Sequence, residues 1–353
     1  MSVPRPRVWV SQPLFDDIVG QLAVHCDVRA TAEVTEYTQD AIAAALADAD
    51  GALVTLNERI GAAELAGAPR LRAIANVGVG YNNLDIAALD AAGIVGTNTP
   101  DVLTETTADL GFALLMAAAR RITESERWLR EGQWGQWSFS TMLGADVHGS
   151  TLGILGMGRI GQAIARRGRH GFGMDVLYHN RSRLPEATER ETGARYVDFD
   201  GLLAQADHLL LVLPYSQASH HVIDAAALAK MKPTATLVNI ARGGLVDEVA
   251  LADALAGGRL SAAGLDVYEG EPAVRPELLA LRNVVLTPHI GSASLATRRA
   301  MVQLAVDNLL AALGFGPRAG DPPTPVTANT RAGKADASAI TTAADAKTAA
   351  GKR

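Results

Sequence analysis

The chain has 353 residues, of which 48% are hydrophobic and 20% charged, and its formal net charge is −6. This composition is ordinary for a globular protein, and the negative balance argues against a nucleic-acid-binding surface. Cys26 is the only cysteine, so no intramolecular disulfide can form. There is neither a signal-peptide pattern nor a run of roughly 18 apolar residues that would span a membrane. We therefore expect a cytoplasmic protein of about two domains.

The first hundred residues alternate between strand-like and helix-like patterns. Short apolar runs at 8–10, 51–55, 71–75 and 93–97 predict strands, and 14–24 and 41–48 have helical spacing. Such alternation is typical of βαβ units around a parallel sheet. The third run leads into the glycine-containing loop 76–82, whose exposed amides suit a carboxylate ligand.

The longest helical pattern covers residues 101–131 and is followed by Trp134 and Trp137 in a loop. An apolar strand then leads into Gly156, Gly158 and Gly161, which have the G-x-G-x-x-G spacing of a dinucleotide-binding turn before a helix. In that interpretation the helix N-terminus holds the pyrophosphate. The pattern alone is weak, because the chain has 34 glycines.

The next strand, at 174–179, ends in Asn180, Arg181, Ser182 and Arg183. An NAD site would carry an acid here to bind the ribose 2′-hydroxyl. Arginine and serine instead suit a 2′-phosphate. We therefore predict a preference for NADP(H), with NAD(H) as a possible second cofactor.

Three later strand exits carry chemically active side chains. Apolar runs at 208–213, 236–241, 262–267 and 284–288 predict buried strands, and the last three are followed by Arg242, Glu271 and His289. Arginine binds a carboxylate through two parallel hydrogen bonds, and histidine supplies a proton. A carboxylate beside the histidine stabilises the protonated imidazole. Each residue alone also fits a purely structural role, but together they suit reduction of a 2-oxo acid by a nicotinamide.

The whole pattern closely resembles the D-isomer-specific 2-hydroxyacid dehydrogenases, over residues 8–314, and is most similar to the glyoxylate and hydroxypyruvate reductases. The motifs that carry the resemblance are 76–81, 99–108, 151–165, 239–244, 264–272 and 287–293.

The resemblance implies a role for each matching residue. The catalytic residues would be Arg242, Glu271 and His289, and the substrate would also contact Leu56, Val79, Gly80 and Ser292. Asp266 matches a position that contacts the nicotinamide carboxamide. No metal site is expected. The cofactor contacts would be Thr107, Gly156, Gly158, Arg159, Ile160, Gly161, Asn180, Arg181, Ser182, Leu213, Pro214, Ile240, Ala241, Arg242, Asp266, His289 and Gly291.

The resemblance also implies an α/β architecture of two Rossmann-like, doubly wound parallel-sheet domains with a cleft between them. A flavodoxin-like substrate domain would comprise residues 1–100 and 290–316. The NAD(P)-binding Rossmann domain would comprise residues 101–289. Such enzymes are usually homodimers built around the cofactor domain, with the Trp134–Trp137 segment reaching toward the partner. Residues 317–353, rich in Ala, Thr, Pro and Gly, read as a disordered low-complexity tail.

The function that we expect is NAD(P)H-dependent reduction of glyoxylate to glycolate and of hydroxypyruvate to D-glycerate. One alternative is a reductase of a longer 2-oxo acid, such as 2-ketogluconate or an arylpyruvate. An alternative of another class is a dinucleotide-sensing binding protein, because such a protein can keep the same residues without turnover. Turnover of NADPH with a 2-oxo acid separates these two classes.

Overall fold

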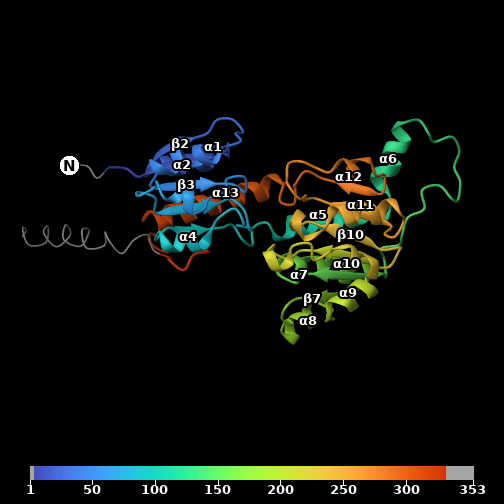
Figure 1. Ribbon diagram of the computed structural model, residues 1–353. Helices are drawn as coiled ribbons and strands as arrows, with labels where there is room; N and C mark the ends of the chain where they lie inside the picture. The colour runs from blue at the N-terminus through green and yellow to red at the C-terminus, as the bar shows by residue number, and fades with distance from the viewer. Residues whose placement is uncertain (1–3, 331–353) are drawn as a thin grey trace, which may run out of the picture. The chain divides into compact units, whose positions relative to one another are not determined.

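The computed structural model describes residues 4–330 (Figure 1). The chain forms two compact units. One contains the described residues of Met1–Leu103 and Leu295–Arg353, and the other is Thr104–Ser294. Each unit is built on a parallel sheet, one of five strands and one of seven, so the α/β prediction is confirmed.

The five-stranded sheet of the first unit has the order β2-β1-β3-β4-β5, which is the flavodoxin-like order. Its strands are β1 (Arg7–Val10), β2 (Asp27–Ala30), β3 (Gly51–Val54), β4 (Ala73–Asn76) and β5 (Val95–Thr97). Strand β2 is absent from the sequence prediction. It lies at the edge of the sheet and is mostly exposed, so its residues lack the apolar pattern of a buried strand.

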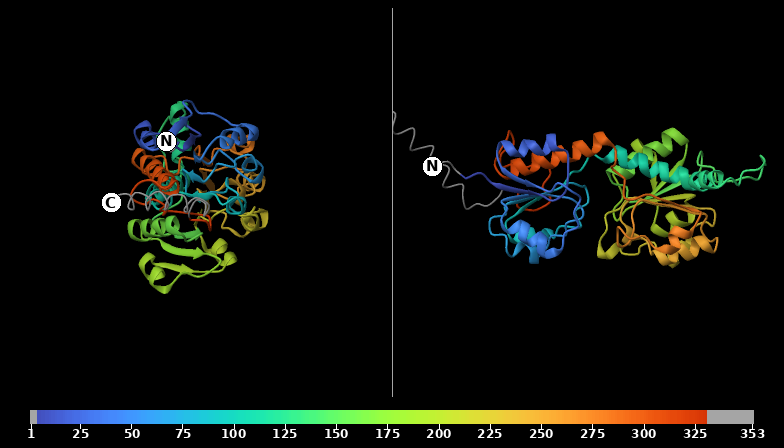
Figure 2. Two further views of the ribbon diagram at one scale, coloured as in Figure 1. Left: turned by 90° about the vertical axis from the view of Figure 1, so that its left-hand side faces the viewer. Right: turned by 90° about the horizontal axis from the view of Figure 1, so that it is seen from above.

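Helices cover both faces of this sheet (Figure 2). They are α1 (Asp16–Val19), α2 (Gln39–Ala47), α3 (Ala62–Leu65), α4 (Ile86–Ala91) and α13 (Leu295–Ala312), with a 3-10 turn at Gly20–Val24. Ile42 and Leu46 of α2 pack with Trp9 and Ile74 of the sheet in one core cluster. Cys26 is buried and free, and its burial raises the pKa of the thiol to about 11.

The seven-stranded sheet of the second unit has the order β12-β11-β10-β9-β6-β7-β8. Its strands are β6 (Thr151–Leu155), β7 (Asp175–His179), β8 (Ala194–Tyr196), β9 (His208–Leu211), β10 (Thr236–Asn239), β11 (Ala262–Leu265) and β12 (Val284–Leu286). The strand order reverses at β6, which pairs with both β7 and β9. Ligands of such sheets bind beyond the carboxyl ends of the strands at this switch point, and the glycine turn follows β6 directly.

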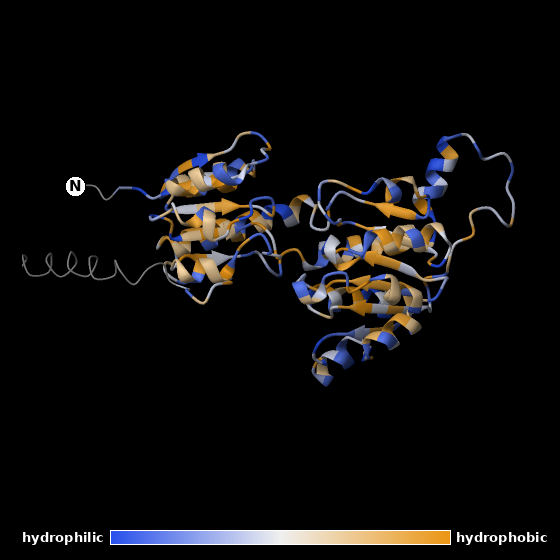
Figure 3. Ribbon diagram, viewed as in Figure 1, coloured by the Kyte–Doolittle hydropathy of each residue, from blue (hydrophilic) through white to orange (hydrophobic). Residues whose placement is uncertain are grey.

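Helices cover both faces of this sheet as well, and the central strands are correspondingly hydrophobic (Figures 2 and 3). Residues of α5 and α7 pack in one core cluster, and residues of α9, α10, α11 and α12 pack in another. The helices are α5 (Thr104–Ala119), α6 (Ile122–Arg130), α7 (Arg159–Arg166), α8 (Glu186–Thr192), α9 (Phe199–Gln205), α10 (Ala225–Lys230), α11 (Glu248–Ala256) and α12 (Pro276–Ala280). Shorter helical turns lie at Arg167–Gly171, Gln217–Ser219 and Gly243–Leu245.

The single long helix predicted over 101–131 is wrong, because the structure divides it into α5 and α6. Arg121, between them, has a left-handed backbone with φ of 54°. Its guanidinium donates to both carboxylate oxygens of Glu124, at 2.8 and 2.9 Å. The backbone N–H of Ala145 returns to the carbonyl of Ala119 at 2.8 Å. The bond from Ala145 satisfies a carbonyl that a continuous helix would have used itself, and the pairing of Arg121 with Glu124 holds the start of α6.

The prediction of a disordered tail from residue 317 is wrong for residues 317–330. Val326 donates its backbone N–H to the carbonyl of Gly96 at 2.8 Å, and Gly96 donates to Thr327 Oγ1 at 3.0 Å. Asn308 also bonds Thr324 twice: its Nδ2 donates to Thr324 Oγ1, and its Oδ1 accepts from the backbone N–H of Thr324. An edge strand presents unpaired backbone groups, and this segment pairs with those of β5. Hydrogen bonds to distant residues therefore hold the segment 317–330 in place, and amino-acid composition does not reveal such bonds. Residues 331–353 lie outside the described residues. None of the helices in the described part of the chain is long and apolar enough to cross a membrane.

Candidate active site

Two glycines of the motif are required by the packing of the protein itself: Gly156 in the turn between β6 and α7, and Gly161 in the first turn of α7. Gly156 has φ of +101°, and a Cβ there would lie 2.6 Å from the backbone nitrogen of Leu213. A Cβ on Gly161 would lie 2.4 Å from the carbonyl oxygen of Gly156. Both distances are far shorter than a carbon contact allows. Gly156 lets the turn approach the segment that follows β9, and Gly161 lets α7 approach the turn.

Gly158 is a different case. A Cβ at this position would meet no protein atom within 4 Å, and its φ of −80° is open to any residue. Gly158 is exposed and is the N-cap of α7, whose first residues are Arg159 and Ile160. A helix start presents amide N–H groups that suit a phosphate. An uncrowded glycine at this point therefore fits a group that must come close to the backbone, such as the pyrophosphate of a dinucleotide.

Asn180, which follows β7, uses its side chain to hold the glycine turn and not to bind a ligand through the same oxygen. Its Oδ1 accepts a hydrogen bond from the backbone N–H of Met157 at 2.7 Å. Arg181 and Ser182, the next two residues, are exposed. Arg183 is exposed as well, with 64% of its side chain accessible, so exposure alone does not separate these three residues.

Arg183 is committed to another partner. Its Nε and Nη2 donate to the two oxygens of Glu189 at 2.8 and 2.7 Å, and Tyr178 donates its hydroxyl to Glu189 Oε1 at 2.7 Å. The hydrogen bonds from Arg183 and then Tyr178 lower the pKa of Glu189 to about 2. The sequence gives no means of distinguishing Arg181 from Arg183, because Glu189 comes close only through the fold.

His289 and Glu271 form a directly bonded pair. His289 Nδ1 donates to Glu271 Oε2 at 2.7 Å, and the other carboxylate oxygen accepts from the backbone N–H of Tyr268 at 2.9 Å. Burial acts to raise the pKa of Glu271, but the hydrogen bond and charge of His289, with smaller effects of the Tyr268 N–H and the Arg242 charge, bring the pKa below its ordinary value. A carboxylate can only accept, so Nδ1 carries a hydrogen and Nε2 is the nitrogen left to exchange a proton.

Arg242 lies close enough to this pair for its charge to interact with Glu271. Its Nη1 donates to the carbonyl of Ala241 at 2.6 Å. Among residues 4–330, it forms no ion pair within 4 Å. Burial lowers the pKa of the guanidinium, and the charge of Glu271 partly offsets this. A half-buried cation without a carboxylate partner suits an anionic ligand.

The backbone around Arg242 is shaped by its neighbours. Asn239 Oδ1 accepts from the N–H of Ala241 at 3.0 Å, and Asn239 Nδ2 donates to the carbonyl of Arg242 at 2.9 Å. A Cβ on Gly243 would lie 1.8 Å from the carbonyl carbon of Tyr268. The glycine therefore lets the exit of β10 lie against the loop that carries Glu271.

Asp266 holds His289 in place. His289 has a left-handed backbone with φ of 52°, which is uncommon for a residue other than glycine, and its N–H donates to the carbonyl of Asp266 at 2.9 Å. The Asp266 carboxylate accepts from the Thr287 hydroxyl at 2.7 Å and from the N–H groups of Ile290 and Gly291 at 2.8 Å. Burial raises the pKa of Asp266, which is fully inaccessible to solvent. Its carboxylate is thus engaged in shaping the turn, and a contact with nicotinamide stays a prediction.

The remaining predicted cofactor residues of the second unit, and the predicted substrate contact Ser292, also lie near strand exits. Thr107 is buried, and its side chain lies beside Gly291. Leu213 packs beside Gly156, and Pro214 follows it at the surface. Ile240 and Ala241 are buried directly after β10, and Ser292 is half-buried after Gly291.

In the first unit, the predicted substrate loop is held by its carbonyl groups. The carbonyl of Gly78 accepts from the N–H of Thr99 at 2.9 Å, that of Val79 from Asn98 Nδ2 at 2.8 Å, and that of Gly80 from Asn76 Nδ2 at 3.0 Å. Leu56 lies against this loop, since its Cδ2 is 2.9 Å from where a Cβ of Gly78 would be.

A buried polar network below this loop was not predicted. Glu58, 1% exposed, accepts from Gln12 at 2.7 Å and from the backbone and hydroxyl of Thr55 at 2.7 and 2.9 Å. Asn83 donates to the carbonyl of Thr55 at 2.9 Å and to Asn76 Oδ1 at 3.1 Å. No local signal marks these residues, because the bonds from Gln12 to Glu58 and from Asn83 to Thr55 join residues 46 and 28 positions apart, and polar residues usually lie at the surface.

Comparisons with known proteins agree with this geometry. Residues 112–291 match the D-isomer specific 2-hydroxyacid dehydrogenase, NAD binding domain. The glyoxylate reductase of Thermococcus onnurineus is 44% identical over 311 residues, covering 87% of this chain and 92% of the relative. The glyoxylate/hydroxypyruvate reductase B of Klebsiella pneumoniae is 45% identical over 310 residues, covering 88% of this chain and 95% of the relative.

Solved structures give the same result. The NADPH-dependent glyoxylate/hydroxypyruvate reductase from Sinorhizobium meliloti, in complex with NADP and malonate, is 35% identical and has a TM-score of 0.80. The match covers 94% of this chain and 99% of that one. The fold and the glycine turn agree with the Thermococcus and Klebsiella relatives, which are more than 40% identical to this chain over most of its length. The chain is therefore an NAD(P)-dependent enzyme of the D-isomer-specific 2-hydroxyacid dehydrogenase family.

Proposed function

We propose that this enzyme reduces glyoxylate to glycolate and hydroxypyruvate to D-glycerate, with NADPH as its preferred cofactor. Two relatives named for glyoxylate or hydroxypyruvate reduction, each more than 40% identical to this chain, support the substrate class. The observation that carries the proposal is the set of Arg242, Glu271 and His289, in which a cation without an ion-pair partner among residues 4–330 lies near a bonded imidazole and carboxylate.

Each of these residues has a separate task in the proposed reaction. Arg242 binds the substrate carboxylate and polarises the keto oxygen through its remaining N–H groups. His289 holds the proton on Nε2 that neutralises the developing alkoxide, and Glu271 keeps Nδ1 protonated and orients the ring. When bound, the reduced nicotinamide supplies the hydride. The amides of Val79 and Gly80 are our candidates for further contacts with the substrate carboxylate.

Turnover tests this proposal directly. We expect NADPH oxidation with glyoxylate and hydroxypyruvate at a kcat/KM above that with pyruvate or 2-ketogluconate. His289→Ala should lower kcat by about 10²–10⁴-fold, the usual contribution of a general acid, with little change in NADPH affinity. Arg242→Lys keeps the charge but loses the paired hydrogen bonds, so it should raise KM for the 2-oxo acid. Near-normal turnover of His289→Ala would remove this residue as the acid, and preference for 2-ketogluconate would replace the substrate assignment.

The NADPH preference rests on Arg181 and Ser182, two exposed residues of the turn after β7. Arg181 and Ser182 are accessible, whereas Arg183 is paired with Glu189. We expect Arg181→Ala to raise KM for NADPH far more than KM for NADH. The matched control is Arg190→Ala, since Arg190 is an exposed arginine of the neighbouring helix paired with Glu186. Equal effects of Arg181→Ala on both cofactors would contradict the assignment.

The family resemblance and the exposed aromatic residues after α6 support a homodimer. This segment extends away from the seven-stranded sheet (Figure 1). Trp134, Trp137 and Phe139 are 52%, 69% and 86% exposed, and large aromatic residues are enriched at protein interfaces. Sedimentation of the wild-type protein should give a dimer, and Trp137→Ser with Phe139→Ser should shift it toward monomer. A monomeric wild-type protein would exclude the dimer.

A further inference from the structure

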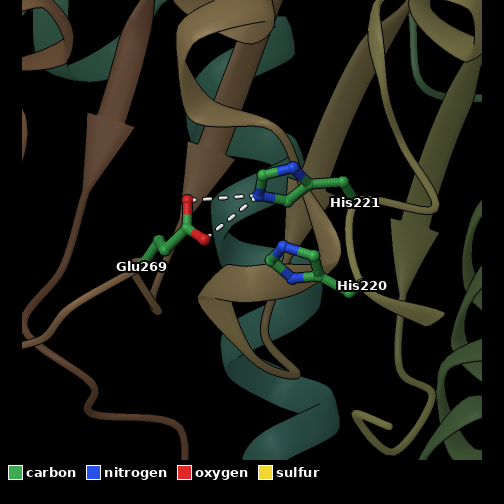
Figure 4. A group of neighbouring side chains, drawn as sticks. All are labelled: His220, His221 and Glu269. Atoms are coloured by element: carbon green, nitrogen blue, oxygen red, sulfur yellow. Dashed lines mark hydrogen bonds and ion pairs between the residues drawn. The ribbon is translucent and has the colours of Figure 1, made fainter. Parts of the chain in front are cut away.

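His220, His221 and Glu269 form a cluster with no part in the proposed reaction (Figure 4). One potential ligand atom from each lies within 4.8 Å of the other two. His221 Nε2 is 3.1 and 3.2 Å from the two carboxylate oxygens of Glu269. These distances are close to the separation of neighbouring ligand atoms around a small metal ion.

The local backbone explains why two consecutive histidines point in the same direction. His221 has a left-handed backbone with φ of 49°, and its N–H donates to the carbonyl of Gly244 at 2.8 Å. The two imidazole rings consequently stack, with centroids 3.8 Å apart and planes 25° apart. Both rings extend toward the side on which Glu269 lies (Figure 4).

Further contacts orient the donors. The Tyr215 hydroxyl lies 3.2 Å from His220 Nδ1. A partner on one ring nitrogen is the usual arrangement for a metal-binding histidine, because it fixes the tautomer and leaves the other nitrogen to the metal. The backbone N–H of Glu269 donates to Glu248 Oε1 at 2.7 Å, which anchors the segment that presents the carboxylate.

We propose that His220, His221 and Glu269 bind one divalent transition-metal ion through Nε2 of each histidine and the carboxylate. Two imidazoles and one carboxylate suit Zn²⁺, Co²⁺, Ni²⁺ or Cu²⁺, whereas Mg²⁺ and Ca²⁺ require oxygen ligands. The metal replaces the hydrogen bond between His221 and Glu269. Because the metal must lie near the plane of each ring, the two stacked rings tilt apart on binding while the Tyr215 hydroxyl stays on His220 Nδ1. Three protein ligands leave at least one coordination position to water.

This site departs from the prediction of no metal made from the sequence. Glu269 is 48 residues from His221 along the chain, so no ligand spacing marks the site. It comes together because β10 and β11 are neighbours in the sheet and the turn at 243–245, which follows β10, bonds the histidine segment. The proposal is independent of the proposed reaction, since none of its three residues takes part in that reaction.

Metal binding by the metal-free, full-length protein tests the site. We expect Co²⁺ to bind in a 1:1 ratio and to develop a visible absorption spectrum, and Zn²⁺ to displace it, as followed by calorimetry. His220→Asn and Glu269→Gln should each weaken binding at least tenfold. Tyr215→Phe, which removes only the hydroxyl beside Nδ1, should weaken it about tenfold, the lower end for loss of such a partner.

His170→Asn is the matched control, because His170 is an exposed histidine elsewhere on the same unit, and its binding should equal that of the wild type. Circular dichroism checks that each variant is folded, and Tyr215→Phe keeps the test valid if a ligand variant unfolds. Absence of saturable binding by the wild type would overturn the proposal. So would unchanged binding in His220→Asn and Glu269→Gln, or an equal loss in His170→Asn.

Discussion

Alanine at Gly158 should separate cofactor binding from folding. A Cβ at this position meets no protein atom within 4 Å, and the backbone conformation is open to alanine. Gly156, two residues earlier, has φ of +101° and no room for a Cβ beside Leu213. Gly158→Ala should therefore leave the protein folded but obstruct the approach of a pyrophosphate, whereas Gly156→Ala should destabilise the protein itself.

The magnitudes differ enough to measure. At an N-cap, alanine is worse than glycine by about 0.5–1 kcal/mol, but a stiffer unfolded chain returns about 0.4–1 kcal/mol, so the two effects of Gly158→Ala nearly cancel. At Gly156, a positive φ costs alanine about 1–3 kcal/mol, and the contact with Leu213 adds about 1–3 kcal/mol. With a sensitivity of about 2–4 °C per kcal/mol, Gly156→Ala should lower Tm by at least about 4 °C.

Cofactor affinity supplies the second readout. A methyl group placed against bound pyrophosphate should cost about 1–3 kcal/mol, which raises the Kd of NADPH about 5- to 150-fold. Fluorescence titration measures this Kd, and thermal unfolding without cofactor measures Tm. Wild-type NADPH affinity in Gly158→Ala would refute the reasoning. A loss of Tm equal to that of Gly156→Ala would refute it as well, because the position would then be crowded by protein.

Two further predictions concern carboxylates that support the site. Asp266→Asn replaces one acceptor oxygen by a donor that faces an N–H or hydroxyl, so it loses a charge-assisted bond worth about 1.5–3 kcal/mol and displaces His289. We expect kcat to fall at least about 10-fold in Asp266→Asn and by less in Thr287→Val. A kcat within twofold of wild type would contradict the role of Asp266. The folded-state pKa of Glu189 is about 2, below its ordinary value of 4.5, so its stabilising effect is present above pH 4.5 and is lost as the pH falls toward 2. Unfolding midpoints measured across this range should fall more steeply for the wild type than for Glu189→Gln, and parallel curves would show that Glu189 does not contribute.

Much of the fold follows from local sequence patterns. The apolar runs of β6, β9, β10 and β11 are buried on both faces, so their residues are nearly all hydrophobic and easy to recognise. The edge strand β2 and the segment 317–330 have no such pattern. Strand β2 pairs with β1, and the segment 317–330 pairs with β5. Local composition does not predict this pairing, because the partner strands are distant in the sequence.

The chemical types and the order of the site residues were determined by the sequence alone. The glycine spacing at 156–161 specifies a tight turn, and the strand exits specify a cation, an acid and an imidazole, because these depend on short-range geometry and residue type. Tertiary structure decided which of them are available. It bonds His289 to Glu271 and leaves Arg242 without an ion-pair partner among the described residues. It also pairs Arg183 with Glu189, whereas Arg181 forms no ion pair among the described residues. Glycine 158 shows the same division: the motif places it in the turn, but only the space around its Cα shows that the protein itself does not require a glycine there. Such distinctions depend on partners outside the local pattern, 18 residues away for His289 and 6 for Arg183, which only the folded chain brings into contact.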